Sequence, residues 1–529
     1  MDISNIDSLS ELEILIGTKK GDKDILSTFH ENNIKHEERK KLGQFYTHQA
    51  LVKYIFSKIP ITDKSKILDP SVGAGAFLIS ALTFNSNNYQ NLYGIDIDNN
   101  ALGLCVQNIN VNSGSVNRNN FKCSNTINSE LWELFPEIYQ AGGFDIVIGN
   151  PPYQHLLAHK DFSPNYEIFK PVLNGVANSA TLMIAKGLQF LKDGGYLGFV
   201  LPKGILRVDS FSGLRKFLGH SVVVKDIFDL GHYFKDVRGD QIILILQKLR
   251  PATFNNKISV SIHKKNLPLD QSTNYTLTQK DLLKYDFYPI YRTKSLTALA
   301  DKLFSIPLTL EAICDGNIFR GLNLSSKDNS ISKEQKSGLI KIFRGDSISK
   351  FGIKYCLFLD LSKIKNDKAK RERLSTEKII LQNLCSKEAG ITATLSGADE
   401  LNIDTVTNVV CDKLDLKFLL GILNSNLSNF FLLHIMFLSS NFTMHTDRQY
   451  IGQLPIVLPR KNVIRKVSKI VEAILLLKGE KGSEYQLLYC QLNKLVYEIY
   501  DLDKNDIKII ETCLKETLSK RQLYVTENE

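Results

Sequence analysis

Short apolar segments alternate with longer helical patterns between residues 66 and 248, and this alternation limits the folds open to the chain. Each segment is bounded by glycine, aspartate or proline, and the six segments are residues 66–70, 92–98, 144–150, 195–202, 224–231 and 241–248. Apolar strands that alternate with helices are typical of a mostly parallel sheet, because the crossover helices cover both of its faces. The first half of the chain is therefore predicted to be a doubly wound α/β domain.

The pattern and the charge both change after residue 250. Residues 251–529 mix short strand-like runs with loops and end in helical segments. Residues 1–250 hold 26 Lys and Arg against 25 Asp and Glu, whereas residues 251–529 hold 40 against 31, a net charge of +9. We therefore predict a helical extension over residues 1–40, a catalytic domain over 41–250 and a second, mixed α+β domain over 251–529. The charge of that second domain suits a polyanion.

Composition excludes several other classes of protein. With 43% hydrophobic and 23% charged residues, the chain has the composition of a globular protein. Its first ten residues lack a cationic start followed by an apolar run, so we expect no targeting signal and a cytoplasmic location. The apolar stretch 416–438 is interrupted by polar residues and is predicted to be a buried helix, not a membrane span. Eight cysteines without a CxxC pair indicate reduced thiols and no metal site.

A glycine turn follows the first predicted strand. Asp69 ends that strand, Gly73 and Gly75 follow it, and Asp96 ends the next strand. In a doubly wound sheet, ligands bind at the carboxyl ends of the strands, and an acid on the second strand can accept the ribose hydroxyls of an adenosine group. Neither GxGxxG nor GxxxxGK[ST] occurs, so a ligand without phosphates, S-adenosylmethionine, fits better than a dinucleotide or a nucleoside triphosphate. Asp69 would face its cationic methionine end.

The third apolar segment ends in the tetrapeptide Asn150, Pro151, Pro152 and Tyr153. An exocyclic amine on an aromatic base is a poor nucleophile because its lone pair is delocalised into the ring. The Asn150 side-chain oxygen and the Pro151 carbonyl can accept hydrogen bonds from such an amine, and Tyr153 can stack on an extruded base. Direct methyl transfer would need neither a covalent intermediate nor a metal.

At this point the chain resembles the gamma class of adenine-specific DNA methyltransferases, the Taq-type enzymes of restriction-modification systems. The resemblance covers residues 43–250 closely and 310–460 more loosely. It implies a seven-stranded sheet, S-adenosyl-L-methionine as cofactor, and methylation of the exocyclic amine (N6) of a flipped-out adenine in double-stranded DNA. Residues 43–47 match the leading motif of the family, and residues 69–77, 94–98 and 150–153 follow in the family's order.

The resemblance also assigns individual residues. Cofactor binding falls to Asn150 and to a set drawn from the leading motif, the glycine loop and the second strand: Gln44, Phe45, Tyr46, Thr47, Asp69, Pro70, Gly73, Gly75, Phe77, Asp96 and Ile97. Where many relatives carry Asp-Phe against the adenine of the cofactor, this chain has Asn125, which can still hydrogen-bond the adenine amine. Phe234 stands where the family places a second aromatic ring against the flipped base.

The second half is similar to the target-recognition domain of the same family. Five residues are predicted to contact DNA: Arg320, Arg344, Lys350, His445 and Arg448. The bases that they would read cannot be derived from the sequence.

Three other functions stay open. The tetrapeptide also suits methylation of cytosine at its exocyclic amine, of guanine in ribosomal RNA, or of a glutamine amide in a release factor. A bifunctional restriction and modification enzyme is a second alternative, although no Pro-Asp pair occurs, so cleavage would come from a separate cognate restriction endonuclease. A DNA-binding protein with a decayed catalytic domain is the third, and the intact tetrapeptide and glycine loop speak against it.

Overall fold

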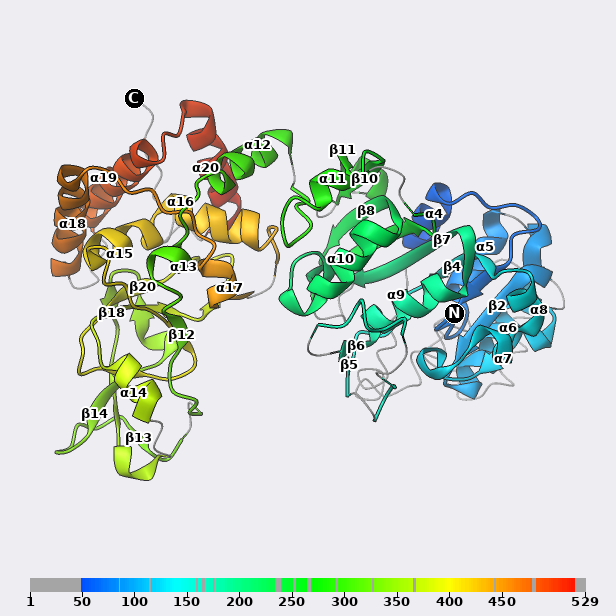
Figure 1. Cartoon of the computed structure of the whole chain (residues 1–529), viewed down its shortest axis with the longest axis horizontal. Helices are drawn as coiled ribbons and strands as arrows, with labels where there is room; N and C mark the ends of the chain where they lie inside the picture. The colour runs from blue at the N-terminus through cyan, green and yellow to red at the C-terminus, as the bar shows by residue number, and fades with distance from the viewer. Residues whose placement is uncertain are drawn as a thin grey trace, which may run out of the picture. The chain divides into compact units, whose positions relative to one another are not determined.

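The chain folds into two compact units, of which the first ends at Ile290 and the second begins at Tyr291 (Figure 1). A computed structural model describes residues 49–518, apart from residues 85, 114–115, 158–159, 164–166, 175–176, 234–238, 251–253, 264–267, 292, 326–327, 365–367, 442–443 and 478–481. The predicted helical extension over residues 1–40 lies outside the described residues.

The first unit is built on one twisted sheet with the strand order β11-β10-β8-β9-β7-β4-β1-β2-β3. Strands β3, β2, β1, β4 and β7 run parallel, whereas β9 is antiparallel to both of its neighbours. The predicted mostly parallel, doubly wound sheet is thus confirmed. Its strands are β1 Ile67–Asp69, β2 Leu92–Asp96, β3 Phe121–Cys123, β4 Phe144–Gly149, β7 Leu191–Pro202, β8 Val223–Gly231, β9 Gln241–Gln247, β10 Lys257–Ile262 and β11 Thr273–Thr278.

The sheet has nine strands and not the seven expected, and the division between the units lies at residue 290 and not near residue 250. The reason is that β10 pairs in parallel with β8, and β11 pairs antiparallel with β10. Polar residues alternate with apolar ones in both strands. Strand β11 lies at the edge of the sheet and is only partly buried, and β10 lies next to it. Their sequences therefore lack the continuous apolar runs that mark the inner strands.

Helices cover both faces of this sheet. A Cβ on Gly198 of β7 would meet Ile55 of helix α4 (Gln49–Lys58), so that face of the sheet receives α4. Gly187 of helix α9 (Ser179–Phe190) faces Leu197, the neighbouring residue on β7. Because successive strand residues point to opposite faces, α4 and α9 lie on opposite sides of the sheet.

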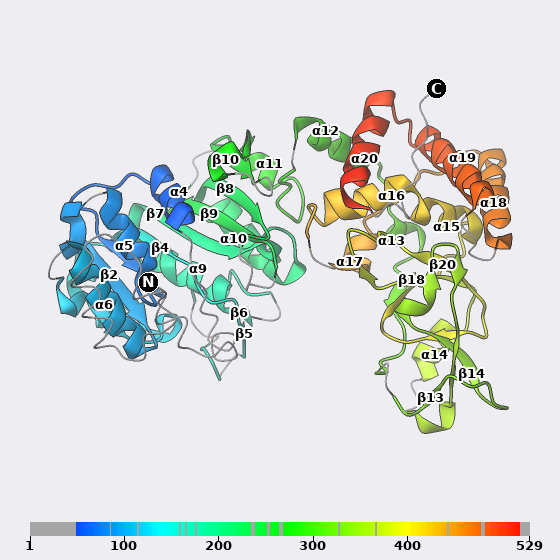
Figure 2. The ribbon, with the colours of Figure 1, turned by 180° about the vertical axis from the view of Figure 1, so that it is seen from behind.

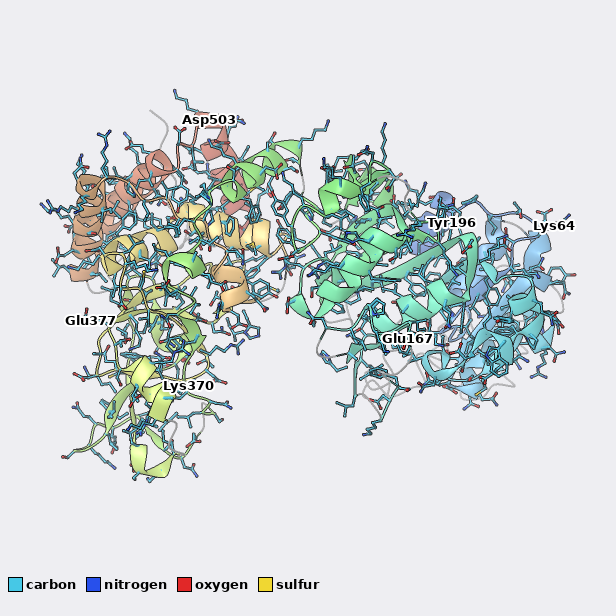
Figure 3. All side chains as sticks on the ribbon, in the orientation of Figure 1. Lys64, Glu167, Tyr196, Lys370, Glu377 and Asp503 are labelled. Atoms are coloured by element: carbon cyan, nitrogen blue, oxygen red, sulfur yellow. The ribbon has the colours of Figure 1, made fainter. Side chains whose placement is uncertain are left out.

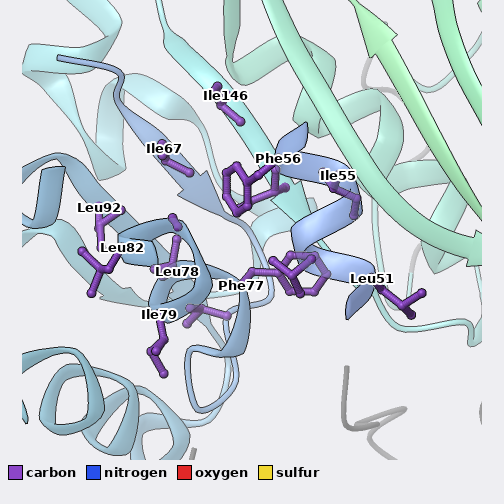
Figure 4. Close-up of a cluster of buried hydrophobic side chains, with 14 of the residues drawn as sticks. Leu51, Ile55, Phe56, Ile67, Phe77, Leu78, Ile79, Leu82, Leu92 and Ile146 are labelled. Atoms are coloured by element: carbon purple, nitrogen blue, oxygen red, sulfur yellow. The ribbon is translucent and has the colours of Figure 1, made fainter. Parts of the chain in front are cut away.

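The core on the α4 side positions the glycine loop. Helix α5 (Ala76–Phe84) begins directly after that loop and packs beside α4 over β1 and β2, as Figure 4 shows for Phe56, Ile67, Phe77 and Leu92. Helix α6 (Asn99–Ser113) follows β2 and completes this layer. The start of α5 is therefore fixed against the sheet by apolar packing.

Among its described residues, the second unit contains two four-stranded sheets, two two-stranded sheets and a group of helices, which Figure 2 shows from behind. This mixture confirms the predicted α+β class and the C-terminal helices. The first sheet consists of β12 Ile318–Arg320, β22 Val406–Val409, β18 Lys378–Gln382 and β20 Ala393–Ser396, and the second of β13 Ile331–Ser332, β17 Leu357–Leu359, β14 Ile340–Phe343 and β21 Leu401–Asn402. The larger helices are α12 Lys294–Phe304, α15 Leu416–Asn424, α18 Lys461–Leu476, α19 Ser483–Ile499 and α20 Lys504–Thr517.

Charged side chains lie at the surface of both units, apart from buried ones such as Asp69 and Lys350. Lys64 of the first unit, and Glu377 and Asp503 of the second, are exposed at the periphery (Figure 3). The apolar stretch 416–438 forms α15, α16 (Asn426–Phe430) and a π-helical turn, and it is buried inside the second unit as predicted. Within the described residues, no single helix is long and apolar enough to cross a membrane, although the bent pair Leu416–Asn424 and Asn426–Met436 passes that test by length and composition.

Candidate active site

The glycine loop between β1 and α5 has a backbone that only glycine adopts readily. Gly73 has a φ of +51° and Gly75 a φ of +93°. A Cβ on Gly75 would lie 2.8 Å from the Sγ atom of Cys105 on α6, so any larger residue would also push the loop away from that helix. Sequence and structure agree here, because strain and close packing both require glycine.

Asp96 closes this loop from the neighbouring strand. Its carboxylate accepts hydrogen bonds from the backbone N–H of Gly73 at 2.8 Å and from the N–H of Asp98 at 3.0 Å. Burial raises the pKa of Asp96, and the two backbone hydrogen bonds counteract part of this shift. Asp96 is 9% exposed at the carboxyl end of β2, compared with 1% for Asp69.

Asp69 is the second buried acid at this edge, and it is 1% exposed. Its Oδ1 atom accepts a hydrogen bond from the N–H of Ser71 and would lie 2.8 Å from a Cβ on Gly149. Burial, with a further contribution from the charge of Asp96, raises the pKa of Asp69 to about 8. A bound cation would favour the ionised form, whereas a phosphate would be repelled by the two acids.

These residues suit an adenosine compound that carries a cation. Asp96 presents a carboxylate at the end of the second strand, where ribose hydroxyls are bound in sheets of this type. Asp69 lies next to Gly149, the residue before Asn150, so a cationic group at Asp69 would also be near the tetrapeptide loop.

The other cofactor residues predicted from the sequence fall into different environments. Ile97 is 61% exposed beside Asp96, as a residue that contacts a ligand can be. Asn125 is exposed, and its side chain accepts a hydrogen bond from the N–H of Ile127. Phe77, in contrast, is 3% exposed in the core below the loop, and the carbonyl of Pro70 accepts a hydrogen bond from the Thr126 hydroxyl. Phe77 and Pro70 therefore support the loop in this structure.

The tetrapeptide leaves the sheet at the end of β4, with Asn150 directly after Gly149. The Tyr153 hydroxyl donates a hydrogen bond to Asn150 Oδ1 at 2.6 Å and lies 3.0 Å from the carbonyl oxygen of Val200 on β7. Burial raises the pKa of Tyr153 well above its ordinary value, so the hydroxyl stays protonated and remains a donor. The side chain of Asn150 is thus oriented by its own loop.

Ser179, which sequence reasoning missed, holds this loop from outside. Its hydroxyl donates to the carbonyl oxygen of Pro152 and accepts from the N–H of Gln154 at 2.8 Å, while its own N–H donates to the carbonyl of Gln154 at 2.9 Å. Ser179 is the first residue of α9 and is 2% exposed. The sequence carries no local signal for this contact, because Ser179 and Pro152 are 27 residues apart.

The same helix also supports the segment that contains Asn125. Lys186 of α9 donates from Nζ to the carbonyl oxygen of Ser129 at 2.7 Å and to Glu130 Oε1 at 2.8 Å. Burial lowers the pKa of Lys186, and the contact with Glu130 counteracts this. Helix α9 therefore positions both the tetrapeptide loop and the segment after β3.

Five predicted residues of the first unit lie outside the described residues. They are the leading-motif residues Gln44, Phe45, Tyr46 and Thr47, and the second aromatic residue Phe234.

Two of the predicted DNA contacts in the second unit belong to one network. Arg320, on β12, forms an ion pair with Asp447, and His445 is an exposed residue of the short strand β23 (Met444–His445). Asn383 connects them, because its side chain contacts both Asp447 and His445.

The other predicted DNA contacts differ in accessibility. Arg344 is partly exposed and lies 3.1 Å from Asp346, and the more exposed Arg448 donates to Glu311. The prediction that Lys350 contacts DNA must be corrected, because this residue is 3% exposed. Its Nζ donates a hydrogen bond to the Tyr489 hydroxyl and lies over the Tyr489 ring. Tyr489 of α19 covers Lys350, and no local pattern in the sequence indicates that contact.

The fold and the site define an α/β protein with a glycine loop and two buried acids at the carboxyl edge of its sheet, beside an Asn-Pro-Pro-Tyr loop. The sequence profile of the family described as N-6 DNA Methylase matches residues 21–334, more than half of the chain, so the chain belongs to this family. A profile described as a TaqI-like C-terminal specificity domain matches residues 340–456. The predicted resemblance to the Taq-type enzymes is thereby confirmed.

Curated relatives agree with this family. The chain is 26% identical over 402 residues to a putative type II restriction enzyme and methyltransferase of Methanocaldococcus jannaschii. The aligned region covers 70% of this chain and 32% of that protein. It is 26% identical over 327 residues to the type II methyltransferase M.HindII of Haemophilus influenzae. Here the aligned region covers 59% of this chain and 57% of that protein. The chain thus spans only a third to rather more than half of the length of these two relatives.

Solved structures show the same fold. The type IIL restriction-modification enzyme MmeI, solved in complex with DNA, matches with a TM-score of 0.60 at 11% identity, over 94% of this chain and 81% of that chain. A nuclease-deletion mutant of the type ISP restriction-modification enzyme LlaGI matches with a TM-score of 0.53 at 14% identity, over 90% of this chain and 49% of that chain.

Proposed function

We propose that the protein is a site-specific DNA methyltransferase that transfers the methyl group of S-adenosyl-L-methionine to N6 of a flipped-out adenine in double-stranded DNA. It would serve as the modification enzyme of a restriction-modification system. The observation that carries this proposal is the oriented Asn150 side chain, which is held by Tyr153 at the end of β4 beside the buried acid Asp69. The family description, N-6 DNA Methylase, supports the choice of an N6 amine in DNA, and the relative named as a type II methyltransferase supports methyl transfer.

The cofactor would be held by the two acids beside the glycine loop, at the ends of β1 and β2. Asp96 would accept the ribose hydroxyls, and Asp69 would face the cationic methionine end. When bound, S-adenosyl-L-methionine supplies an electrophilic methyl group on a sulfonium. Ile97 and Asn125 are exposed at the same edge of the sheet, where they would contact the adenine of the cofactor.

The tetrapeptide loop would bind the target base. Asn150 Oδ1 has a second lone pair beside the one that accepts from Tyr153, so it can also accept a hydrogen bond from the adenine amine. The Pro151 carbonyl would accept the other amine hydrogen. Together they draw the amine lone pair out of the ring and toward the methyl group. The ring of Tyr153 would stack on the base, which adds about 1–3 kcal/mol of binding.

The second unit would select the DNA site. Its specificity-domain match and its share of the positive charge support this role. Cleavage would fall to a separate cognate endonuclease, although some relatives are named as combined restriction enzymes and methyltransferases. The proposed compartment is the cytoplasm, where an enzyme of this type would meet its DNA.

The test is to incubate the protein with labelled S-adenosyl-L-methionine and double-stranded DNA, and to identify the modified nucleoside after digestion. We expect N6-methyladenine. Methylcytosine, or label found only in RNA or protein, would overturn the proposed substrate.

An Asn150→Ala variant serves as the matched control, since it should lose methyl transfer and still bind the cofactor. Retained turnover in that variant would remove Asn150 from its role. DNA cleavage by the pure protein with Mg²⁺ would show that a separate nuclease is not needed.

A further inference from the structure

Arg320 and Asp447 form a two-point ion pair in the second unit. Arg320 donates from Nε to Asp447 Oδ1 and from Nη2 to Oδ2, both at 2.7 Å. The two parallel hydrogen bonds fix the plane of the guanidinium group, which a single contact would not do. The Arg320 side chain is nevertheless 40% exposed, so its outer edge reaches solvent.

Asp447 is itself held in place from behind. The Asn383 side chain, on a residue that is 1% exposed, donates from Nδ2 to Asp447 Oδ1 at 3.0 Å and to Thr407 Oγ1 at 2.8 Å. Because a carboxylate only accepts, these contacts fix the direction of the Asn383 amide, whose Oδ1 then faces His445 Nδ1 at 2.5 Å. The backbone N–H of Thr446 donates to the Asn383 carbonyl at 2.7 Å. The support of Arg320 is thus built from buried and partly buried hydrogen bonds.

The outward edge of Arg320 keeps its donors available. Among the described residues, no acceptor engages Nη1 of Arg320. The second hydrogen of Nη2 also points away from the carboxylate, because Nε and Nη2 each direct one hydrogen to Asp447. The group therefore presents a pair of N–H donors in a fixed direction.

The charge of the Arg320–Asp447 pair distinguishes two possible ligands of the Arg320 guanidinium, a phosphate and a base edge. A phosphate contact depends on net positive charge, but here the charge of Arg320 is balanced by the adjacent carboxylate of Asp447, whose pKa is held below its ordinary value by Arg320 and Asn383 against the effect of burial. A base edge is uncharged and needs aligned donors instead. Guanine presents two acceptors, O6 and N7, in the major groove, and their spacing fits an arginine fork.

We propose that Arg320, held by Asp447 and Asn383, reads a guanine at one fixed position of the DNA site, and that it is a specificity-determining residue of the second unit. This inference rests on the proposed function, because it presupposes that the second unit contacts DNA. It goes further in naming one residue, one base and the edge of that base.

The test compares the sequence preference of the full-length protein with that of Arg320→Lys. Each variant methylates a library of DNA sites, and the modified adenines are mapped by sequencing. Lysine keeps the positive charge but lacks the fork, so a phosphate contact would survive and a guanine contact would not. We expect the preference for guanine at one position to fall by roughly ten- to hundredfold, while the other positions of the site keep their preferences.

Two further variants make the result specific. Asp447→Asn leaves Arg320 in place without its charged support, and it should weaken the preference at the same position. Arg373→Ala is the control, because the Arg373 guanidinium lies 3.9 Å over the ring of Phe319, the residue next to Arg320, and holds no carboxylate of this network. It should leave the preference unchanged. Thermal melting of each variant reports folding, and Asp447→Asn carries the test if Arg320→Lys melts early.

The outcomes separate this inference from the proposed function. A wild-type site without guanine, or an unchanged preference in both Arg320→Lys and Asp447→Asn, would overturn the role of Arg320. Equal loss of methylation at all sequences would also overturn it, because that is the behaviour of a phosphate contact. If the wild-type protein methylates no adenine in DNA, the proposed function itself fails.

Discussion

The hydroxyl of Tyr153 donates a hydrogen bond to the side-chain oxygen of Asn150, only three residues before it, at 2.6 Å. A phenol has a single hydrogen, so the nearby carbonyl oxygen of Val200, at 3.0 Å, shares or competes for the same donor. Tyr153 therefore has two roles in the proposed reaction: its ring offers a stacking surface, and its hydroxyl orients the amide that accepts the target amine.

Tyr153→Phe should separate these two roles. The variant keeps the ring and loses the hydroxyl, so we expect the single-turnover rate to fall by about fivefold, in line with about 1 kcal/mol for one hydrogen bond. Tyr153→Ala should fall further because it also loses the stacking surface. A Tyr153→Phe rate equal to that of the wild type would show that Asn150 needs no such support.

The buried carboxyl of Asp69 should make cofactor binding depend on pH. Its pKa of about 8 in the folded protein means that Asp69 is protonated at pH 6–7.5, whereas a bound cation favours the ionised form. Binding then releases a proton, and the apparent affinity for S-adenosylmethionine should rise by about tenfold per pH unit in this range. Calorimetry in two buffers of different ionisation enthalpy measures the released proton.

Asp69→Asn is the matched control for that experiment, because asparagine resembles the protonated acid and cannot release a proton. The variant should show the same heat in both buffers and a weaker pH dependence. In the absence of ligand, the contribution of Asp69 to stability should fall as the pH rises from about 4 to 8, because the folded state holds a proton that the unfolded chain has released, and the difference between wild type and Asp69→Asn isolates this contribution. If the stability of the wild-type protein rose relative to that of Asp69→Asn between about pH 4 and 8, the raised pKa of Asp69 would be contradicted.

Asp96→Asn should weaken cofactor binding through the ribose. We expect the affinity for adenosine to fall by about tenfold to a hundredfold, which corresponds to losing hydrogen bonds to a charged acceptor of about 1.5–3 kcal/mol. The matched control is a ligand, 2′,3′-dideoxyadenosine, which lacks the two ribose hydroxyls that would donate hydrogen bonds to Asp96. Its affinity should be the same for wild type and variant. An equal loss for both ligands would mean that Asp96 only supports Gly73 of the loop.

Ser179→Ala should lower turnover without weakening the cofactor. The change removes the hydroxyl that donates to Pro152 and accepts from Gln154, so the tetrapeptide loop loses its external support. Asn178→Ala is the control, because the Asn178 side chain caps the same helix through the N–H of Ala180 and makes none of these loop contacts. Both variants should lose about 1 kcal/mol of stability, but only Ser179→Ala should show a reduced rate constant. Similar turnover in the two variants would remove Ser179 from loop positioning.

Much of the fold and of the site could be predicted because the relevant signals are local. Apolar runs bounded by glycine and aspartate marked the inner strands, and the tetrapeptide stands directly at the end of one of them. Strands β10 and β11 were missed because a strand at or near the edge of a sheet alternates polar and apolar residues. Lys350 was misassigned because its burial under Tyr489 depends on a contact 139 residues away.

The sequence by itself determined the class of sheet, the order of its motifs and the chemistry of the tetrapeptide, since each of these depends on residues that are neighbours in the chain. Only the tertiary structure decided what holds those residues. Ser179 meets Pro152, and Arg320 meets Asp447, across 27 and 127 residues of chain. Side-chain contacts of this kind follow from the packing of whole elements, and no local pattern of residue types records them.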